Sequence, residues 1–576
     1  MYDYIIAGGG PAGCCLANRL SEDANVRVLL LEAGDPDSHP YFRMPGGFAK
    51  LTGARGTWGY ETVPQKGLDG KRVWYPQGKV MGGGTSINAQ VYTRGHPKDF
   101  DEWAEECGCE GWAFADILPY YRKLEDNPRF SDEFHGQGGP FKVSDPVPHP
   151  LTLAYVRAGQ QAGIPYNHDF NGAKQEGIGI YQVTNRDGKR TSGASAYLYP
   201  AKGRKNLTVK SRAQASRILF EGKRAVGVEW IERGSSTAQS ATCEREVIVT
   251  AGAIGSPKLL MLSGVGRAQD LKEVDIETVH DLQGVGQNFH DHMDIFAINE
   301  CSGDFSFDVY KSLPMQVWAG LQYLMFKSGP IASNLCDGGG FWYGDPDARS
   351  PDIQFHFLPG SGLEVGVEKI RNGVTSNSAF LRPRSRGSVK LASNNPAEAP
   401  LIDPNYWGDA YDREISIKAF RWVREIMRQE AFEPFIKGEV LPGPDVQTDD
   451  EIAAYAYKFA KTDYHPVGAC KMGVDDMAVV GTDLKVHGLA NVRVCDSSIM
   501  PRVNSSNTAA PTIMIAEKVI AWLRLHVHGP GGHGAMPMRG GTMAKVARVL
   551  ELLDKNRLPA HVPAATASMV TRLSVP

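Results

Sequence analysis

The sequence predicts an α/β protein in which a parallel sheet with covering helices is interrupted by an inserted antiparallel sheet. The first 34 residues read as strand, glycine turn, helix and strand, with apolar runs at residues 4–7 and 26–31. A later apolar strand, at residues 247–250, ends in a second glycine turn. Residues 353–357 and 387–391 instead alternate between apolar and polar side chains, which indicates half-buried strands of another sheet.

The first glycine turn has the spacing G-x-G-x-x-G at Gly8, Gly10 and Gly13. In this spacing the glycines permit a tight turn, admit a pyrophosphate and let the helix pack closely on the strand. The N–H groups at the start of the helix favour the phosphates. Glu32 ends the next strand, where a carboxylate accepts from a ribose diol and disfavours the 2′-phosphate of NADP. The motif predicts a Rossmann-like site for NAD or FAD, and the alternative is a turn that only resembles one.

With 576 residues the chain is too long for one hydrophobic core, so we expect at least two domains. The nucleotide-binding domain is expected to be discontinuous and to comprise residues 1–150, 190–300 and 456–525. The inserted substrate-binding domain is expected to comprise residues 151–189 and 301–455.

The end of the chain differs in composition from the rest. Residues 526–576 begin with a glycine-rich stretch, and we expect a linker and a tail with one short helix at residues 543–555. Histidines 526, 528 and 533 could bind a metal, but a tail that docks on the body or on another subunit is favoured. No metal site is predicted, and a homo-oligomer is possible.

The overall charge and the cysteines limit the partners and the compartment. The net charge is −3, from 62 basic and 65 acidic residues, so the total points neither to nucleic acid nor to anionic lipid. No run of about 18 apolar residues occurs, so no membrane span is expected. The nine cysteines are scattered, and the first strand starts next to Met1 without a signal peptide. A reducing, cytoplasmic compartment is the simplest interpretation.

A second glycine loop follows at Gly82, Gly83 and Gly84, and continues into Thr85 and Asn88. Its backbone could press against a planar or charged ligand, although a plain flexible loop is the alternative. A third block, residues 252–266, places two small-residue turns around a short helix opened by a serine and a proline.

Four separated blocks together resemble the glucose–methanol–choline (GMC) oxidoreductases, flavoenzymes that oxidise alcohols. The blocks are the first glycine turn and residues 78–95, 252–266 and 464–512, and the resemblance covers roughly residues 1–525. It implies that the dinucleotide is FAD. Some members carry a histidine bonded covalently to the flavin where this chain has Ile87, so non-covalent FAD is expected.

The same resemblance assigns the positions that contact FAD. For the ADP half they are Gly8, Gly10, Pro11, Ala12, Gly13, Glu32, Ala33 and Ala215. For the flavin half they are Gly82, Gly83, Thr85, Asn88, Ala89, Val91, Asp496, Ser497 and Thr508.

By the same resemblance, the stretch around His465 is expected to carry the chemistry, whereas any one of the fifteen histidines taken alone would more often be structural. Pro466 biases His465 toward an extended backbone, which can direct the imidazole into a cavity. A histidine is well suited to remove a hydroxyl proton near neutral pH, while the hydride moves to flavin N5. By resemblance Asn507 is its partner, donating a hydrogen bond to the substrate oxygen. The alternative for Asn507 is a helix N-cap.

The substrate is expected to be an alcohol, of the primary class, that becomes an aldehyde. Asp337, Phe341 and Tyr464 are the candidate substrate contacts, and further aromatic residues suggest an apolar pocket. The electron acceptor could be O₂, a quinone or another redox protein. The rival functions are a lyase or a light-driven decarboxylase on the same scaffold, and a non-catalytic FAD protein.

Overall fold

The computed structural model describes residues 1–53, 55–362 and 370–524. The expected tail at 526–576, with its helix and its three histidines, lies outside the described residues. No helix within the described residues combines the length and the apolar character that crossing a membrane requires.

The first sheet has the expected parallel core. Its strand order is β10-β2-β1-β13, with β25 added beside β13, and all these neighbours are parallel. The strands are β1 (Tyr2–Ala7), β2 (Val28–Leu31), β10 (Leu207–Lys210), β13 (Ala238–Val249) and β25 (Val492–Val494). The antiparallel pair β11 (Ala213–Glu221) and β12 (Arg224–Glu232) extends the other half of β13. Segments from both ends of the chain therefore complete one sheet.

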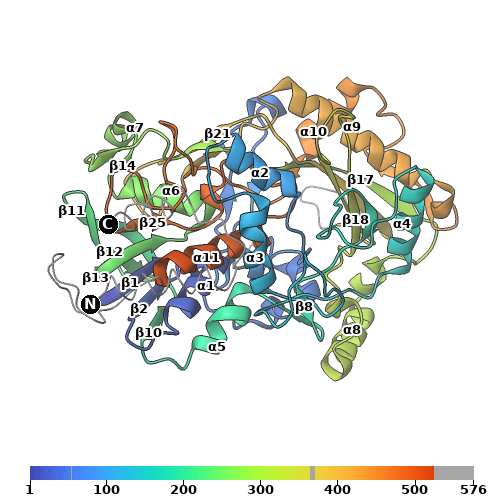
Figure 1. Cartoon of the computed structure of the whole chain (residues 1–576). Helices are drawn as coiled ribbons and strands as arrows, with labels where there is room; N and C mark the ends of the chain where they lie inside the picture. The colour runs from blue at the N-terminus through green and yellow to red at the C-terminus, as the bar shows by residue number, and fades with distance from the viewer. Residues whose placement is uncertain (54, 363–369, 525–576) are drawn as a thin grey trace, which may run out of the picture.

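Helices α1 (Pro11–Leu20) and α11 (Ala509–Arg524) pack against each other, and α3 (Phe114–Leu124) packs on α11. Figure 1 shows α11 and α1 beside the strands β1, β2 and β13. Helix α6 (Gly252–Leu262) packs on β11, and α2 (Pro97–Glu105) packs on α3. The chain also forms α5 (Tyr199–Ala201) and α7 (Ala268–Glu273). The first and last helices of the described chain thus lie together.

The second sheet is antiparallel, with the order β23-β17-β20-β19-β18-β7 and β24 paired to β17. Its strands are β7 (Gly177–Ile180), β17 (Met293–Cys301), β18 (Gly338–Trp342), β19 (Ile353–Leu358), β20 (Gly373–Phe380), β23 (Ile436–Leu441) and β24 (Lys461–Thr462). Helices α4 (Pro150–Gln161), α9 (Ala410–Met427) and α10 (Asp449–Phe459) accompany it, and α8 (Leu313–Phe326) stands apart. The expected α/β fold with an inserted antiparallel sheet is confirmed.

Two strands, β17 and β24, lie on the other side of an expected boundary. β24 belongs to residues 456–525, which were expected in the nucleotide-binding domain, but it pairs with β17. The sequence boundary at residue 300 placed β17 with the nucleotide-binding domain, but β17 pairs with β20, β23 and β24 in the second sheet. The strand is apolar enough for either sheet, and its pairing depends on partners that come much later in the sequence. β17 is therefore part of the roof over the site.

The alternation in β19 separates two faces of this roof. Phe357 stacks on Tyr155 of α4 with ring centroids 4.5 Å apart. On the opposite face His356 and Leu358 line the main cavity. Neighbouring side chains on a strand point to opposite faces, so the alternation seen in the sequence places the polar side chain of His356 over the site and Phe357 away from it.

Candidate active site

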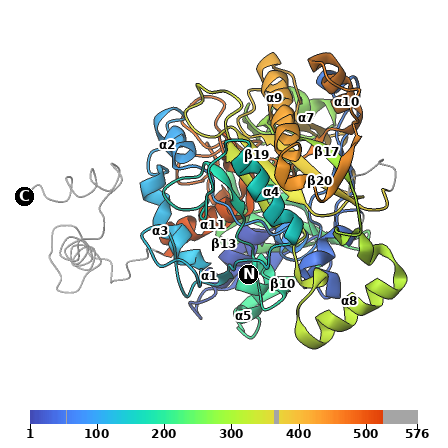
Figure 2. The same ribbon diagram turned by 90° about the vertical axis from the view of Figure 1, so that its right-hand side faces the viewer.

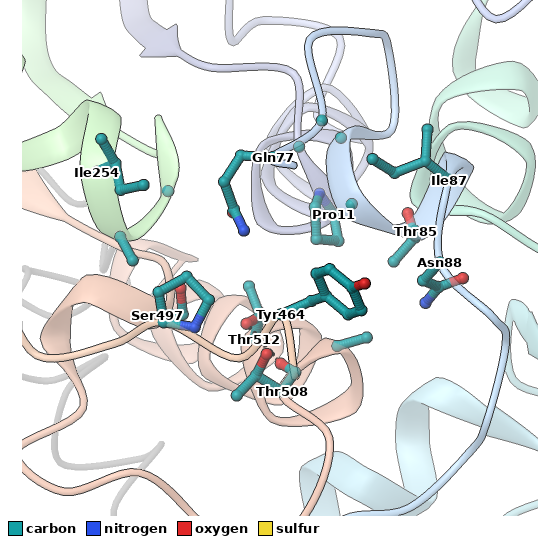
Figure 3. A pocket seen from close by; sticks show the side chains of 18 of the residues that line it. Pro11, Gln77, Thr85, Ile87, Asn88, Ile254, Tyr464, Ser497, Thr508 and Thr512 are labelled. Atoms are coloured by element: carbon teal, nitrogen blue, oxygen red, sulfur yellow. Dashed lines mark hydrogen bonds between the residues drawn. The ribbon is translucent and has the colours of Figure 1, made fainter. Parts of the chain in front are cut away.

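One cavity connects all four sequence blocks. It runs from the first glycine turn to His465 and is bordered by β1, the loop after β4 (Trp74–Tyr75), the start of α6 and the turn before α11. Figure 3 shows side chains of these blocks around a common space, with the ring of Tyr464 among them. Of the predicted positions, those that line the cavity are Gly8, Gly10, Pro11, Ala12, Glu32, Ala33, Gly83, Thr85, Asn88, Ala89, Val91, Ala215, Tyr464, His465, Asp496, Ser497, Asn507 and Thr508.

The first glycine turn is held by contacts that exclude side chains. Gly8 has φ +124°, and a Cβ there would lie 2.3 Å from the carbonyl oxygen of Thr250. A Cβ on Gly13 would lie 1.9 Å from the oxygen of Gly8, so Gly13 allows α1 to pack on the turn without itself lining the cavity. At Gly10 a Cβ would meet only an atom at 3.8 Å, which leaves room for a ligand.

Glu32 faces this turn from the end of β2. Its carboxylate accepts hydrogen bonds from the backbone N–H of Gly9 at 2.7 Å and of Gly34 at 2.6 Å. Burial raises the pKa of Glu32 to about 7, and the two N–H donors oppose that rise. Because a carboxylate offers about four acceptor positions, Glu32 can still accept from the hydroxyls of a ribose.

The second glycine loop contacts the first. The N–H of Gly82 donates to the oxygen of Gly9 at 2.7 Å, and a Cβ on Gly83 would lie 2.9 Å from the Cα of Gly10. Gly82 itself does not line the cavity. Gly84 and Gly252 line the cavity, and a Cβ at either position would meet no atom within 4 Å, so both positions border open space. The two loops and the start of α6 thus form an open cradle of backbone groups, which fits an extended dinucleotide.

Asp496 joins two of the blocks. Its Oδ2 accepts from the N–H of Gly252 at 2.8 Å and from the hydroxyl of Ser256 at 2.5 Å. Its Oδ1 accepts from the N–H and the hydroxyl of Ser498 at 2.8 and 2.6 Å. Burial raises the pKa of this carboxyl, and the four donors oppose the rise. Asp496 therefore fixes the start of α6 against the short helix η9 (Ser497–Ile499), which lies within the fourth block.

His465 lies at the far end of the cavity and is 7% exposed. Its backbone N–H donates to Oδ1 of Asp291 at 2.8 Å. The other oxygen of Asp291 accepts from the hydroxyls of Tyr75, Tyr406 and Thr462. This buried carboxylate fixes the backbone of the histidine to the second sheet.

The ring of His465 has a defined tautomer. His292 Nε2 lies 3.0 Å from the carbonyl oxygen of Leu381, so this nitrogen carries the hydrogen. Burial and the neighbouring His465 lower the pKa of His292 to about 3, which makes His292 neutral and its Nδ1 an acceptor. His465 Nδ1 faces this acceptor at 3.2 Å and Oδ2 of Asp463 at 3.3 Å, so we assign the His465 hydrogen to Nδ1. The Nε2 of His465 is left with its lone pair.

Asn507 completes the pair. Its Oδ1 accepts from Thr93 Oγ1 at 2.7 Å and from Gln354 Nε2 at 3.1 Å, which orients the amide. Its Nδ2 then lies 3.0 Å from His465 Nε2. The amide of Asn507 is directed at His465, whereas the alternative of an N-cap would direct it at the N–H groups of α11.

Two predicted substrate contacts lie elsewhere. Asp337 is fully buried, and its carboxylate accepts from the N–H of His149 at 2.8 Å and from the hydroxyl of Thr152 at 2.7 Å, at the start of α4. Phe341 is also buried and packs with Phe170 at 5.4 Å between ring centroids. Asp337 follows the cavity residue Cys336 along the chain, but its carboxylate bonds to the start of α4, and Phe341 belongs to the buried strand β18.

Several cavity residues had not been predicted. Those nearest the catalytic pair are Cys336, His356, Leu358, Asn377, Lys461 and Asp463. His356 Nε2 lies 3.8 Å from Oδ2 of Asp463. Burial alone would lower the pKa of His356, but the Asp463 carboxylate raises it to about 10. The alternation in residues 353–357 was the available signal for His356, whereas nothing in the sequence pattern marked His292 or Asp463.

The comparisons with known proteins show the family of the chain. Family models for GMC oxidoreductases match residues 2–294 and 383–516. The chain is 44% identical over 527 residues to "Alcohol dehydrogenase [acceptor]" of Pseudomonas putida, covering 90% of this chain and 94% of that protein. It is 43% identical over 540 residues to "Oxygen-dependent choline dehydrogenase" of Paraburkholderia phytofirmans, covering 92% and 95%.

Solved structures of two other proteins are similar to this chain over most of its length. Pyridoxine 4-oxidase from Mesorbium loti matches with a TM-score of 0.83 and 28% identity, covering 92% of this chain and 100% of that one. Formate oxidase matches with a TM-score of 0.85 and 25% identity, covering 91% and 98%.

Proposed function

This chain belongs to the GMC oxidoreductase family and is an FAD-dependent enzyme acting on CH–OH donors, and we propose that it oxidises an uncharged primary alcohol to the aldehyde with His465 as the base. The observation that carries this proposal is the pairing of the unprotonated His465 Nε2 with the amide donor of Asn507 at 3.0 Å, on the wall of the cavity.

The catalytic pair suits removal of a hydroxyl proton. A hydroxyl on the cavity side, within hydrogen-bond distance of both nitrogens, donates its hydrogen to His465 Nε2 and accepts from Asn507 Nδ2. When the proton transfers, the carboxylate of Asp463, 3.3 Å from Nδ1, stabilises the imidazolium. The Asn507 amide stabilises the negative charge that develops on the substrate oxygen.

The cofactor is assigned to the glycine cradle. Glu32 and the turn at Gly8–Gly13 would hold the ADP half, and the loop at 82–91 with Ser497 and Thr508 would hold the flavin half. FAD, when bound, supplies the acceptor for the hydride that leaves the alcohol carbon. Ile87 has no nucleophilic atom, so we propose that FAD is held without a covalent bond. Acid precipitation of the purified protein should leave the flavin in the supernatant, and flavin in the pellet would contradict this.

The charges near the catalytic pair favour an uncharged substrate. Lys461 Nζ lies 2.5 Å from Oδ2 of Asp294, and Asp463 lies beside His356 and His465. Each charge at this end thus has an opposite charge next to it. Recognition of a quaternary ammonium group, as in choline, ordinarily uses a carboxylate or an aromatic cage facing the ligand. Here the cavity wall includes Val91, Cys336 and Leu358 and the rings of Phe48, Trp58, Tyr60 and Tyr464. Each of its three acidic residues, Glu32, Asp463 and Asp496, already has partners within the chain.

The test is anaerobic mixing of the FAD-loaded protein with benzyl alcohol, butan-1-ol or choline. The two uncharged alcohols should bleach the flavin absorbance and yield the aldehydes, while choline should bleach it much more slowly. Bleaching by choline alone would overturn the proposed substrate class. The absence of bleaching with every alcohol would overturn the proposed reaction. The same protein supplied with O₂, a quinone analogue or an artificial electron acceptor identifies the acceptor that reoxidises it.

A further inference from the structure

Helix α8 presents an apolar face to solvent. Its large side chains are exposed by 47 to 73%, namely Leu313, Val317, Trp318, Leu321, Leu324, Met325 and Phe326. At 3.6 residues per turn, all of these except Phe326 fall on one arc of the helix, opposite Ala319 and Tyr323. Ala319 and Tyr323 are buried, and the hydroxyl of Tyr323 donates to the oxygen of Gly188 at 2.9 Å. Figures 1 and 2 both show α8 standing out from the body.

The surroundings of this face are basic. No acidic residue lies between Asp308 and Asp337, a stretch that contains Lys311 and Lys327 at the two ends of α8. Lys311 pairs with Asp308 at 2.9 Å, and the ammonium of Lys327 lies over the ring of Tyr323.

A neighbouring segment has the same character. The short helix η7 (Pro330–Ala332) packs against both α8 and η2 (Pro45–Lys50). No acidic residue lies between Asp37 and Glu61, whereas Arg43, Lys50 and Arg55 do, and all three are exposed. Although the net charge of the whole chain is −3, the two segments around this apolar helix carry more basic than acidic residues.

We propose that α8, together with the η1–η2 segment (residues 40–50), forms a face that docks on an anionic lipid bilayer. A 14-residue helix is too short to span a bilayer but suits the headgroup boundary, with its apolar arc inserted. Tryptophan is favoured at that depth, and flanking lysines and arginines reach the anionic headgroups.

The charge distribution favours an anionic bilayer over a second copy of the chain as the partner of this face. A two-fold contact through α8 would bring the same basic residues of two copies together and would repel. An anionic bilayer offers both an apolar interior and the opposite charge. Phe48 of η2 and Cys336 after η7 line the active-site cavity, so the docking face borders the site.

Vesicle sedimentation tests the proposal with the full-length, FAD-loaded protein. Vesicles of phosphatidylglycerol and phosphatidylcholine should pellet the protein at low salt, with less in the pellet at high salt or with pure phosphatidylcholine. Leu321→Glu with Leu324→Glu, both on the exposed arc, should reduce the partition coefficient about tenfold or more. Val147→Glu with Val474→Glu adds the same charge at exposed apolar positions elsewhere and should leave binding close to wild type.

A second pair of variants tests the charge. Arg43→Gln and Lys50→Gln should each weaken binding to anionic vesicles about fivefold, with unchanged flavin absorbance as the measure of folding. Wild-type protein that stays in the supernatant with anionic vesicles overturns the proposal, as does an α8 variant that pellets like wild type. A wild-type dimer that the α8 variant converts to monomers, without vesicle binding, would assign the face to a second copy instead.

Discussion

The two ends of the cavity are built in different ways. At the ADP end, most of the contacts come from residues 8–33, as backbone groups of the turn at Gly8–Gly13 and the carboxylate of Glu32. At the catalytic end, the contacts are side chains brought by β17, β19, β24 and the turn before α11. A continuous motif can be read from the sequence, whereas side chains from separate strands meet only after the second sheet has formed. Substitutions at the two ends should therefore separate catalysis from cofactor binding.

The largest effect is expected from His465→Ala. Loss of the general base should reduce the rate of flavin reduction by an alcohol about 10³-fold, within the range for acid–base catalysis. FAD should remain bound, because the glycine cradle is unchanged. Stopped-flow absorbance measures both quantities, with His168→Ala as a control at an exposed histidine. A variant that reduces its flavin at the wild-type rate would exclude His465 as the base.

Asp463→Asn should have the next largest effect. The substitution keeps the size of the side chain but removes the negative charge beside His465 Nδ1. We expect turnover to fall about tenfold to a hundredfold, by analogy with residues that hydrogen-bond to the far side of metal-ligating histidines. The acid limb of the pH–rate profile should also move to lower pH, because the imidazolium loses its anionic neighbour. Asp445→Asn, at an exposed position, serves as the control. A drop in rate with an unshifted profile would indicate a purely structural role.

Glu32→Ala should affect the other end of the cavity. Loss of the acceptor for Gly9 and Gly34 N–H should loosen the turn and weaken FAD binding about tenfold or more. The rate of flavin reduction at saturating FAD should change little, because the catalytic pair is untouched. Titration of apoprotein with FAD gives the dissociation constant, and Asp35→Ala is the nearby control. If the variant bound FAD normally but reduced it slowly, the proposed separation of the two ends would be wrong.

The smallest effect concerns stability. The folded-state pKa of His356, about 10, lies above its ordinary value of 6.5, so the protonated ring stabilises the fold fully below pH 6.5. This contribution declines as pH rises and is lost above pH 10. The melting temperature of wild type should exceed that of His356→Gln most at pH 6, and the difference should shrink toward pH 10. A difference that is constant across this range would show that His356 is not charged in the fold.

The sequence by itself determined the parallel sheet, the two glycine loops and the identity of His465 as the candidate base. The sheet and the loops depend on residues that are close in the chain, where the spacing of glycines restricts the local backbone. His465 was identified because its motif resembles that of a known family, and the proline after it only favours an extended backbone. Alternation in β19 also indicated a strand with a polar face, although it did not say what that face covers.

Only the tertiary structure decided which side chains surround the base. It directed Asp337 and Phe341 into the core, placed β17 in the second sheet and brought His292 and Asp463 to His465 Nδ1. The physical reason is that the partners of β17, and the partner β7 of β18, lie far away in the sequence. The direction in which these side chains point is therefore fixed only when the whole sheet assembles. The exposure of α8 follows the same rule, because an apolar helix is buried or exposed according to what the rest of the chain packs against it.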